Sequence, residues 1–353
     1  MQNNETNNIS RKGSGKRALL IVVVVILSLI LAFLLAVIIG VNAFLNQVQR
    51  PDDMPDTMPP EELESILNQE DEVPSDFTGP ILSAEDVTIP PAEVQVEDAD
   101  DVFSILLLGV DNNSRQYRSR TDAMILCTVN VTQKTLTMTS FMRDTYVYIP
   151  EFYNQRLNVA YPVGGFETLY DTLEYNFGVS VNKGVAVNFT SFKEVIDAVG
   201  GVEIELTGSE AGHLNKNNGW WLQTGVNRLT GEQALAYSRI RALDNDYYRT
   251  NRQRKVLSAL VQQAKKLSAA EMYKVVNMLI PMVTTDMSND EILNAAIRVV
   301  PIIKDLTIVT HRIPIDEGHT LAMVDGMSVL IPDLEKNRQY LVDILGDLPE
   351  TEE

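Results

Sequence analysis

Cysteine and histidine are both scarce in this chain. Cys127 is the only cysteine, so no internal disulfide can form. It lies in the apolar run 123–131, where a buried and inert thiol is expected. The three histidines, His213, His311 and His319, lack the spacing of metal ligands. A zinc site built from histidine and cysteine is therefore not expected.

Positive charge is also in short supply. The net charge at pH 7 is -19, and residues 101–353 carry 24 Lys and Arg against 31 Asp and Glu. Neutralising the phosphates of a nucleic acid requires a basic face. The composition therefore argues against a nucleic-acid partner.

Long apolar runs are absent except for one near the N-terminus. Residues 18–41 contain a single polar side chain, Ser28, and four basic residues precede them: Arg11, Lys12, Lys16 and Arg17. Such a helix can cross the ~30 Å hydrocarbon core of a membrane. A cleavable signal peptide is the alternative, but its apolar region is usually only about 7–15 residues long. The pattern predicts a single-pass cell-membrane protein with a cytoplasmic tail (1–17), a transmembrane helix (18–45) and an extracellular remainder.

Residues 46–100 have the composition of a spacer. Positions 51–100 hold sixteen Asp and Glu and no Lys or Arg, and proline recurs along them. Like charges repel and proline stiffens the chain, so an extended, disordered, acidic extracellular linker is predicted. A short helix is possible over residues 61–68.

From residue 101 the pattern changes to that of a folded domain, predicted to extend to residue 347. Residues 102–110 form an apolar run typical of a buried strand, and Asp111 follows it. Two β-rich runs, 122–131 and 135–141, flank a turn and predict a hairpin. Ser191 and Asp246 are expected to begin helices. Alternating strands and helices favour a layered α/β domain.

Arginine gathers at predicted strand ends and helix starts. A guanidinium group is always charged, and its planar fork suits phosphate oxygens. Arg249, Arg252 and Gln253 share one face in the first turns of the helix that Asp246 begins, where free N–H groups favour an anion. Asp111 and Asp122 are interleaved with the first arginines, and two carboxylates beside a phosphate site favour Mg²⁺. The arginines are 115, 118 and 120, then 143, then 239, 241, 249, 252 and 254.

Six segments together resemble the LytR–CpsA–Psr family, most closely over residues 102–270. They are residues 106–111 (LLLGVD), 119–124 (SRTDAM), 141–145 (FMRDT), 156–161 (RLNVAY), 229–241 (LTGEQALAYSRIR) and 246–253 (DYYRTNRQ). Three residues depart from the usual pattern: Met142 in place of proline, and Ser119 and Ala123 in place of glycine and threonine. These changes affect backbone stiffness more than charge.

The resemblance implies a three-layer α/β/α sandwich with a mixed central sheet and an apolar pocket for a polyprenyl chain. It implies an enzyme, a phosphotransferase that uses Mg²⁺ to move a glycan phosphate from a polyprenyl-pyrophosphate glycolipid to peptidoglycan. The apolar run 187–199 could line the pocket, although ordinary core packing is favoured. Phosphoryl transfer needs mainly positioning and charge stabilisation, so arginines and Mg²⁺ suffice.

The resemblance also implies a role for individual residues. Asp111 and Asp122 would hold the metal. Arg143 would stabilise charge on the transferred phosphoryl group, and Asp144 or Asp246 would orient or deprotonate the acceptor hydroxyl. The residues expected to bind pyrophosphate are Arg120, Arg143, Arg239, Arg241, Arg249, Arg252 and Gln253.

Three other interpretations use the same residues. A hydrolase would cleave the pyrophosphate with water as the acceptor. A non-catalytic regulator of the cell envelope would only bind polyprenyl phosphate, and a cytoplasmic tail of 17 residues is too short for a DNA-binding domain. A purely structural wall-anchoring protein would not need several arginines near acidic residues.

Overall fold

The computed structural model describes residues 40–51, 60–67, 71, 73, 77–93, 95–110, 118–243 and 246–346. The chain divides into two units, residues 1–47 and 48–353. The predicted cytoplasmic tail and residues 18–39 of the predicted transmembrane helix lie outside the described residues. Within the described residues, no helix has both the length and the apolarity that crossing a membrane requires.

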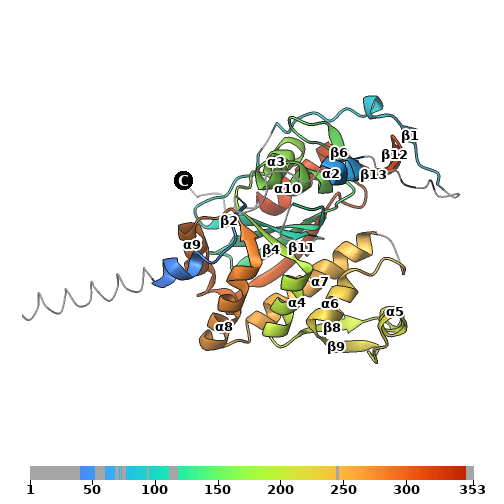
Figure 1. The fold of residues 1–353 in the computed structure, drawn as a ribbon. Helices are drawn as coiled ribbons and strands as arrows, with labels where there is room; N and C mark the ends of the chain where they lie inside the picture. Colours follow the sequence, from blue (N-terminus) through green and yellow to red (C-terminus); the bar gives the residue numbers. More distant parts are fainter. Residues whose placement is uncertain are drawn as a thin grey trace, which may run out of the picture. The chain divides into compact units, whose positions relative to one another are not determined.

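A six-stranded sheet forms the centre of the second unit (Figure 1). Its two hairpin pairs β2–β3 and β3–β4 are antiparallel, as is β10–β7, whereas β2–β7 and β4–β11 are parallel. The predicted α/β class with a mixed central sheet is therefore confirmed. In spatial order the strands are β10 (Val283–Thr285), β7 (Gly184–Asn188), β2 (Val102–Val110), β3 (Thr121–Asn130), β4 (Thr135–Phe141) and β11 (Thr307–Ile313).

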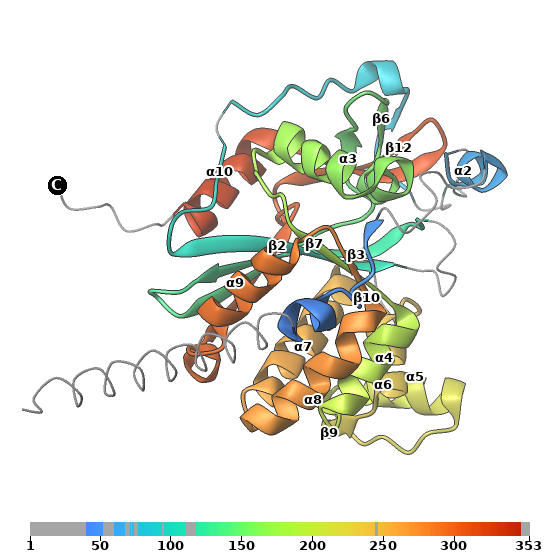
Figure 2. The ribbon, with the colours of Figure 1, turned by 60° about the vertical axis from the view of Figure 1, so that its left-hand side comes forward.

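Helices cover both faces of this sheet, which explains why β2 is apolar along most of its length. On one face, α3 (Ala160–Phe177) and α10 (Leu334–Leu345) pack against Leu106 and Leu108 of β2. On the other face, α7 (Asp246–Ala264) and α9 (Asn289–Val299) pack against Phe103 of the same strand. Figure 2 shows α3 and α10 on the opposite side of the strands from α7.

A smaller layer lies beyond α7. Strands β8 (Val202–Leu206) and β9 (Gly225–Leu229) pair with each other, and α5 (Gly208–Asn218) and α6 (Gly231–Ser238) pack on them through a separate apolar cluster. The helix predicted from Ser191 is α4 (Phe189–Ala198). Its N-cap is Asn188, whose side chain accepts a hydrogen bond from the Ser191 backbone N–H. α8 (Ala269–Leu279) precedes β10.

The prediction that residues 46–100 form a disordered linker is wrong for its described parts. β1 (Ile81–Leu82) pairs with β12 (His319–Val324), which in turn pairs with β13 (Met327–Pro332). Leu82, Val87 and Ile89 pack against the apolar cluster below these strands. A few apolar side chains between the acids are enough to attach this stretch to the domain, while most acids among its described residues are exposed. The remaining elements are α2 (Pro60–Leu67), β5 (Tyr146–Tyr148) and β6 (Asn154–Arg156).

Candidate active site

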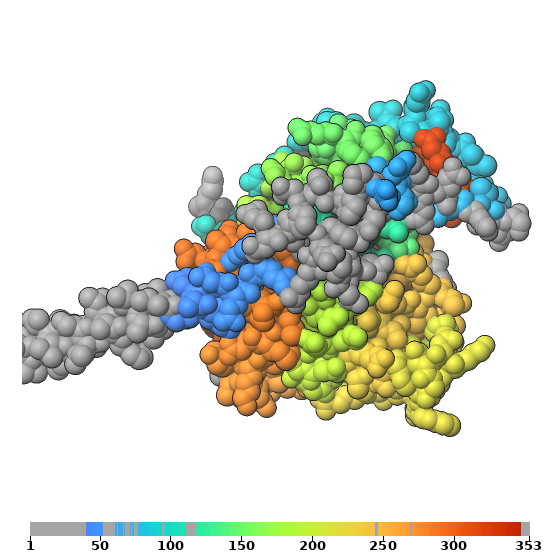
Figure 3. Space-filling view, in the orientation of Figure 1, coloured from blue at the N-terminus to red at the C-terminus, as the bar shows by residue number. Residues whose placement is uncertain are grey.

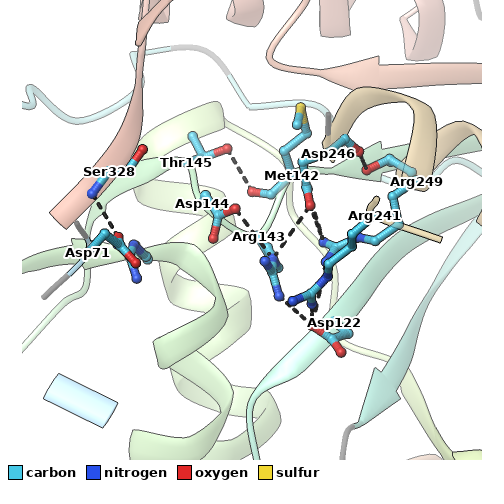
Figure 4. A network of polar contacts seen from close by, with 12 residues as sticks. Asp71, Asp122, Met142, Arg143, Asp144, Thr145, Arg241, Asp246, Arg249 and Ser328 are labelled. Carbon is cyan, nitrogen blue, oxygen red and sulfur yellow. Dashed lines mark hydrogen bonds and ion pairs between the residues drawn. The ribbon is translucent and has the colours of Figure 1, made fainter. Parts of the chain in front are cut away.

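The strand register brings the predicted acidic and basic residues to one edge of the sheet. Met124 of β3 pairs with Phe141 of β4, so the start of β3 lies beside the end of β4. Asp122 stands at that start, and Arg143 and Asp144 follow that end. The first turns of α7 and the segment after α6 add further charges at the same place (Figure 4).

Arg143 lies among three carboxylates. Its Nη1 donates a hydrogen bond to Asp122 Oδ1 at 2.7 Å, and its Nε donates one to Asp144 Oδ2 at 3.3 Å. The same Nε lies 3.8 Å from Asp246 Oδ1. Arg143 is therefore held by the protein's own anions.

Two more arginines converge on the same carboxylates. Arg249 pairs with Asp246 at 2.8 Å, and its Nη1 lies 4.0 Å from Asp122 Oδ1. Arg241 Nη2 lies 3.5 Å from that same oxygen, although its side chain is largely exposed. Gln253 donates to the Asp122 backbone carbonyl. The structure thus brings together six of the predicted site residues, Arg143, Asp144, Asp246, Arg241, Arg249 and Gln253, around the predicted metal ligand Asp122.

Arg249 retains unused hydrogen-bonding capacity. Its side chain is only 3% exposed, yet its Nε and Nη1 have no hydrogen-bond acceptor among the described residues. Leaving a buried donor unsatisfied costs about 1–3 kcal/mol. An anion that accepted bonds from Arg249 would remove this cost.

Burial and charge shift the ionisation of the aspartates in opposite directions. Burial raises the pKa of Asp122, but the charges of Arg143 and Arg249 outweigh burial, so its pKa lies below the ordinary value. Burial raises the pKa of Asp246 above its ordinary value; the charge of Arg249 opposes this rise, and that of Asp144 adds to it. Asp122 is therefore an ionised carboxylate at neutral pH, and Asp246 is the more basic of the two.

A cavity of about 680 Å³ adjoins the charged cluster. Its polar lining includes Asp122, Arg239, Arg241, Arg249 and Gln253, and Lys193 and Glu232 add further charges. The rest of the wall is largely apolar, and it includes Leu107, Val187, Phe192, Leu257, Leu279 and Val283, from β2, β7, α4, α7, α8 and β10. An elongated apolar ligand with a charged head group suits such a cavity.

The cavity also revises the interpretation of residues 187–199. Val187, Phe192 and Val195 line it, while Ile196 and Val199 are buried. The sequence favours core packing for the whole run, but core packing describes only Ile196 and Val199. Both kinds of position are apolar at helical or strand spacing, so the sequence holds no signal that separates them.

The remaining predicted residues lie in other settings. Arg252 is buried and pairs with Glu210 at 2.8 Å, and it also donates to the Ile240 carbonyl, so it is not one of the arginines of the cluster. Arg239 lines the cavity and lies 4.3 Å over the Phe189 ring. Arg120 is partly buried immediately before β3. Asp111 lies outside the described residues.

At the edge of the sheet, Asp122 is a carboxylate of the kind that a hard cation such as Mg²⁺ takes as a ligand. No group of three His, Cys, Asp or Glu side chains that could hold a metal occurs in the described part of the chain. Asp122 nevertheless offers an ionised carboxylate, and Val110 at the end of β2 pairs with Thr121 beside it. Mg²⁺ typically takes one or two carboxylates and completes its shell with water and substrate phosphates.

Known proteins share this sequence pattern. The polyisoprenyl-teichoic acid–peptidoglycan teichoic acid transferase TagU of Enterococcus faecalis is 38% identical over 203 residues, which are 55% of this chain and 65% of that protein. The transferase TagT of Bacillus subtilis is 36% identical over 180 residues, 49% of this chain and 56% of that protein. The chain thus spans less than two thirds of the length of these curated relatives.

Solved structures share the fold as well. A structure described as TagT bound to LIIa-WTA is similar with a TM-score of 0.56 and 28% identity, covering 75% of this chain and 99% of that one. One described as YwtF (TagT) with bound octaprenyl pyrophosphate lipid has a TM-score of 0.53 and 27% identity, with the same coverage. The family model described as LytR_cpsA_psr family matches residues 73–342. The chain therefore belongs to the LytR–CpsA–Psr family.

Proposed function

We propose that this protein is a phosphotransferase that moves a glycan phosphate from a polyprenyl-pyrophosphate glycolipid to peptidoglycan during cell-wall assembly. The observation that carries the proposal is the cavity, whose apolar wall leads to a cluster of arginines with unused donors on Arg249. The names of the relatives, teichoic acid transferases, and the lipid in one related structure support it. The arginines match the charge of pyrophosphate, and the apolar wall of the cavity matches a polyprenyl chain.

Pyrophosphate would bind by replacing internal ion pairs. Arg241 is largely exposed at the cavity and can turn toward a ligand, while Arg143 and Arg249 are already fixed by the aspartates. Arg239 lines the same cavity and is the fourth candidate ligand for the phosphates. Fixed guanidinium groups stabilise the charge that builds up on the transferred phosphoryl group without having to reorganise during the reaction.

Asp111 and Asp122 are the residues that would hold Mg²⁺, and the bound metal would neutralise part of the pyrophosphate charge. The low pKa of Asp122 favours this role because a metal ligand must be deprotonated. Asp246 has the raised pKa and lies beside Arg143, so it is our candidate base, with Asp144 orienting the acceptor. The acceptor hydroxyl gives its proton to Asp246, its oxygen bonds to the glycan phosphorus, and the bond from that phosphorus to polyprenyl phosphate breaks.

The location follows from the N-terminal sequence. We infer that residues 18–45 are a transmembrane helix, that residues 1–17 remain in the cytoplasm, and that the catalytic domain is extracellular. Basic residues before the apolar run and acidic residues after it support this orientation. The proposed function requires the lipid donor and the wall acceptor to be accessible on that side of the membrane.

A transfer assay tests the function. The full chain in detergent is incubated with radiolabelled polyprenyl-pyrophosphate glycolipid, peptidoglycan and Mg²⁺, and label on the peptidoglycan is measured. We expect transfer by the wild type and its loss in Arg249→Ala, with Arg228→Ala as a control because Arg228 is exposed on β9. Release of free glycan phosphate without transfer would instead identify a hydrolase, and binding of lipid without turnover would identify a regulator.

A further inference from the structure

The chain pairs with the central sheet at Gln49, near the start of the linker predicted for residues 46–100. Gln49 pairs with Thr284 of β10 in parallel fashion, its N–H donating to the Val283 carbonyl at 3.3 Å and its carbonyl accepting from Thr285 at 3.0 Å. The Gln49 side chain also donates to the Pro281 carbonyl at 3.1 Å. The segment 48–50 therefore extends the central sheet at its β10 edge.

Arg50 fastens this segment to the next helix. Its guanidinium donates to the Met287 carbonyl and, at 2.6 Å, to Asn289 Oδ1, at the start of α9. Val48 is buried. Residues 48–50, which we call the clamp, thus hold β10 and the beginning of α9 together.

The clamp lies close in sequence to the long apolar run. That run ends at Val41, seven residues before Val48. A fully extended chain spans about 3.5 Å per residue, so Val48 lies within about 25 Å of the end of the run. Residues 40–45 are helical, and a helix rises only about 1.5 Å per residue, which shortens this reach. If the apolar run spans the membrane, the surface around the clamp therefore lies near the membrane.

The surface around the clamp includes a helix that is apolar on two sides. Ala295 and Val299 of α9 pack toward the core. Leu293, Ile297 and Val300 recur at a spacing of four and three residues on the other side of this helix and are 41%, 63% and 59% exposed. This exposed apolar row lies opposite the buried one, although α9 also carries Asp290, Glu291 and Arg298, and an exposed apolar row of this kind can contact protein or lipid. Figure 3 shows the orange atoms of this part of the chain on the molecular surface.

The same face borders the cavity. α8 carries the exposed Val276, and its last residue, Leu279, lines the cavity together with Val283 of β10. Val283 is also the residue whose carbonyl binds the clamp. The clamp therefore binds both β10, whose Val283 lines the cavity, and the start of α9, which carries the exposed apolar row.

We propose that α8 and α9 form a docking face that rests on the lipid bilayer and is held there by the clamp. The inference rests on the membrane anchor of the proposed function and adds the orientation of the domain on the membrane. The apolar wall at Leu279 and Val283 then lies next to the lipid phase, and a polyprenyl chain enters the cavity without crossing water. Residues 51–100 come after the clamp, so they do not lift the domain away from the membrane.

Fluorescence quenching tests the docking face. The full chain is reconstituted in vesicles of equimolar phosphatidylethanolamine and phosphatidylglycerol, with an environment-sensitive fluorophore on Ile297→Cys. The matched control is Val226→Cys, an exposed apolar position on β9. Cys127 is half-buried and burial raises the pKa of its thiol to about 12, so it reacts slowly with the label, and Cys127→Ser in both labelled chains removes it altogether. Quenchers carried on the lipid tails should remove most of the fluorescence at position 297 and leave position 226 unchanged.

Several outcomes would overturn the inference. Equal quenching at both positions in a chain that resists alkaline extraction would refute the docking face alone. Release of the chain from the vesicles by alkaline carbonate would refute the anchor, and the docking face with it. Protection of position 297 from aqueous iodide without quenching by lipid would assign the face to a second copy of the chain. Arg50→Ala should reduce the quenching at position 297, and unchanged quenching would refute the role of the clamp.

Discussion

Replacing Asp122 with asparagine should have opposite effects on pyrophosphate binding in the absence and presence of Mg²⁺. Asp122 Oδ1 accepts a hydrogen bond from Arg143 and lies 3.5 Å from Arg241 and 4.0 Å from Arg249. In the free protein this carboxylate competes with any anion for the same guanidinium groups. With Mg²⁺ present, the proposed role of Asp122 as a metal ligand makes the same charge favourable.

The magnitude follows from the distances. An anion bonded to the Arg143 guanidinium would lie about 5 Å from Asp122, where two like charges repel by about 3 kcal/mol at an effective dielectric constant of about 20. Salt screens part of this repulsion. Without Mg²⁺, Asp122→Asn should therefore bind inorganic pyrophosphate more tightly by about 1.5–3 kcal/mol, which is on the order of 10- to 100-fold.

Calorimetric titration of the full chain in detergent with inorganic pyrophosphate, in EDTA and in Mg²⁺, measures both effects. The wild type should gain affinity when Mg²⁺ is added, and Asp122→Asn should not. Glu203→Gln serves as the control because Glu203 is an exposed carboxylate that pairs with Lys266. Weaker binding by Asp122→Asn in EDTA would refute the electrostatic argument, and an unchanged response to Mg²⁺ would refute the metal role.

Four further predictions test individual residues. Arg143→Ala should reduce glycan transfer on the order of 10³-fold or more, because removal of a transition-state arginine has this effect in other phosphoryl transfers; a loss of less than tenfold in the radiolabel assay would contradict its role. The rate of transfer should fall as the pH drops through the pKa of Asp246, which lies above its ordinary value, and Asp246→Asn should abolish this dependence as well as most of the activity. Arg252→Ala should destabilise the fold by about 3–5 kcal/mol in urea unfolding, because it leaves Glu210 buried without its partner; equal stability would refute a structural role. Arg254 is buried, two of its nitrogens have no hydrogen-bond acceptor among the described residues, and burial and the charge of Arg312 lower its pKa to about 10; Arg254→Met should raise the melting temperature, and a lower one would contradict this reasoning.

Elements with a regular pattern could be predicted from the sequence. The apolar run 102–110 and the two β-rich runs that follow it correspond to β2, β3 and β4, with the expected hairpin. The predicted start of α4 was less accurate. Ser191 has the residue type and spacing of a cap, yet Asn188 occupies the cap position because β7 ends there and its side chain reaches the Ser191 N–H. Where two suitable cap residues lie close together, the end of the preceding strand determines which of them caps the helix.

The candidate site was predictable only in part. Arg249 and Arg252 share a helix face in sequence, but Glu210 of α5 binds Arg252 and removes it from the cluster. That partner lies 42 residues away, and no local pattern indicates it. The acidic stretch illustrates the same limit, because Leu82 and Val87 pack on the domain although their neighbours have the composition of a linker. Long-range contacts decide both cases.

The charge balance of the cluster provides an argument for the proposed Mg²⁺. Three arginines and three aspartates face one another: Arg143, Arg241 and Arg249 with Asp122, Asp144 and Asp246. Formally their charges cancel. Pyrophosphate would bring several negative charges into this neutral and partly buried site, where uncompensated charge is costly. Arg239 can offset some of that charge, and a divalent cation on Asp122 would offset more while drawing the carboxylate away from Arg143. Asp122 would then pair with Arg143 in the free protein and hold the metal when pyrophosphate is bound.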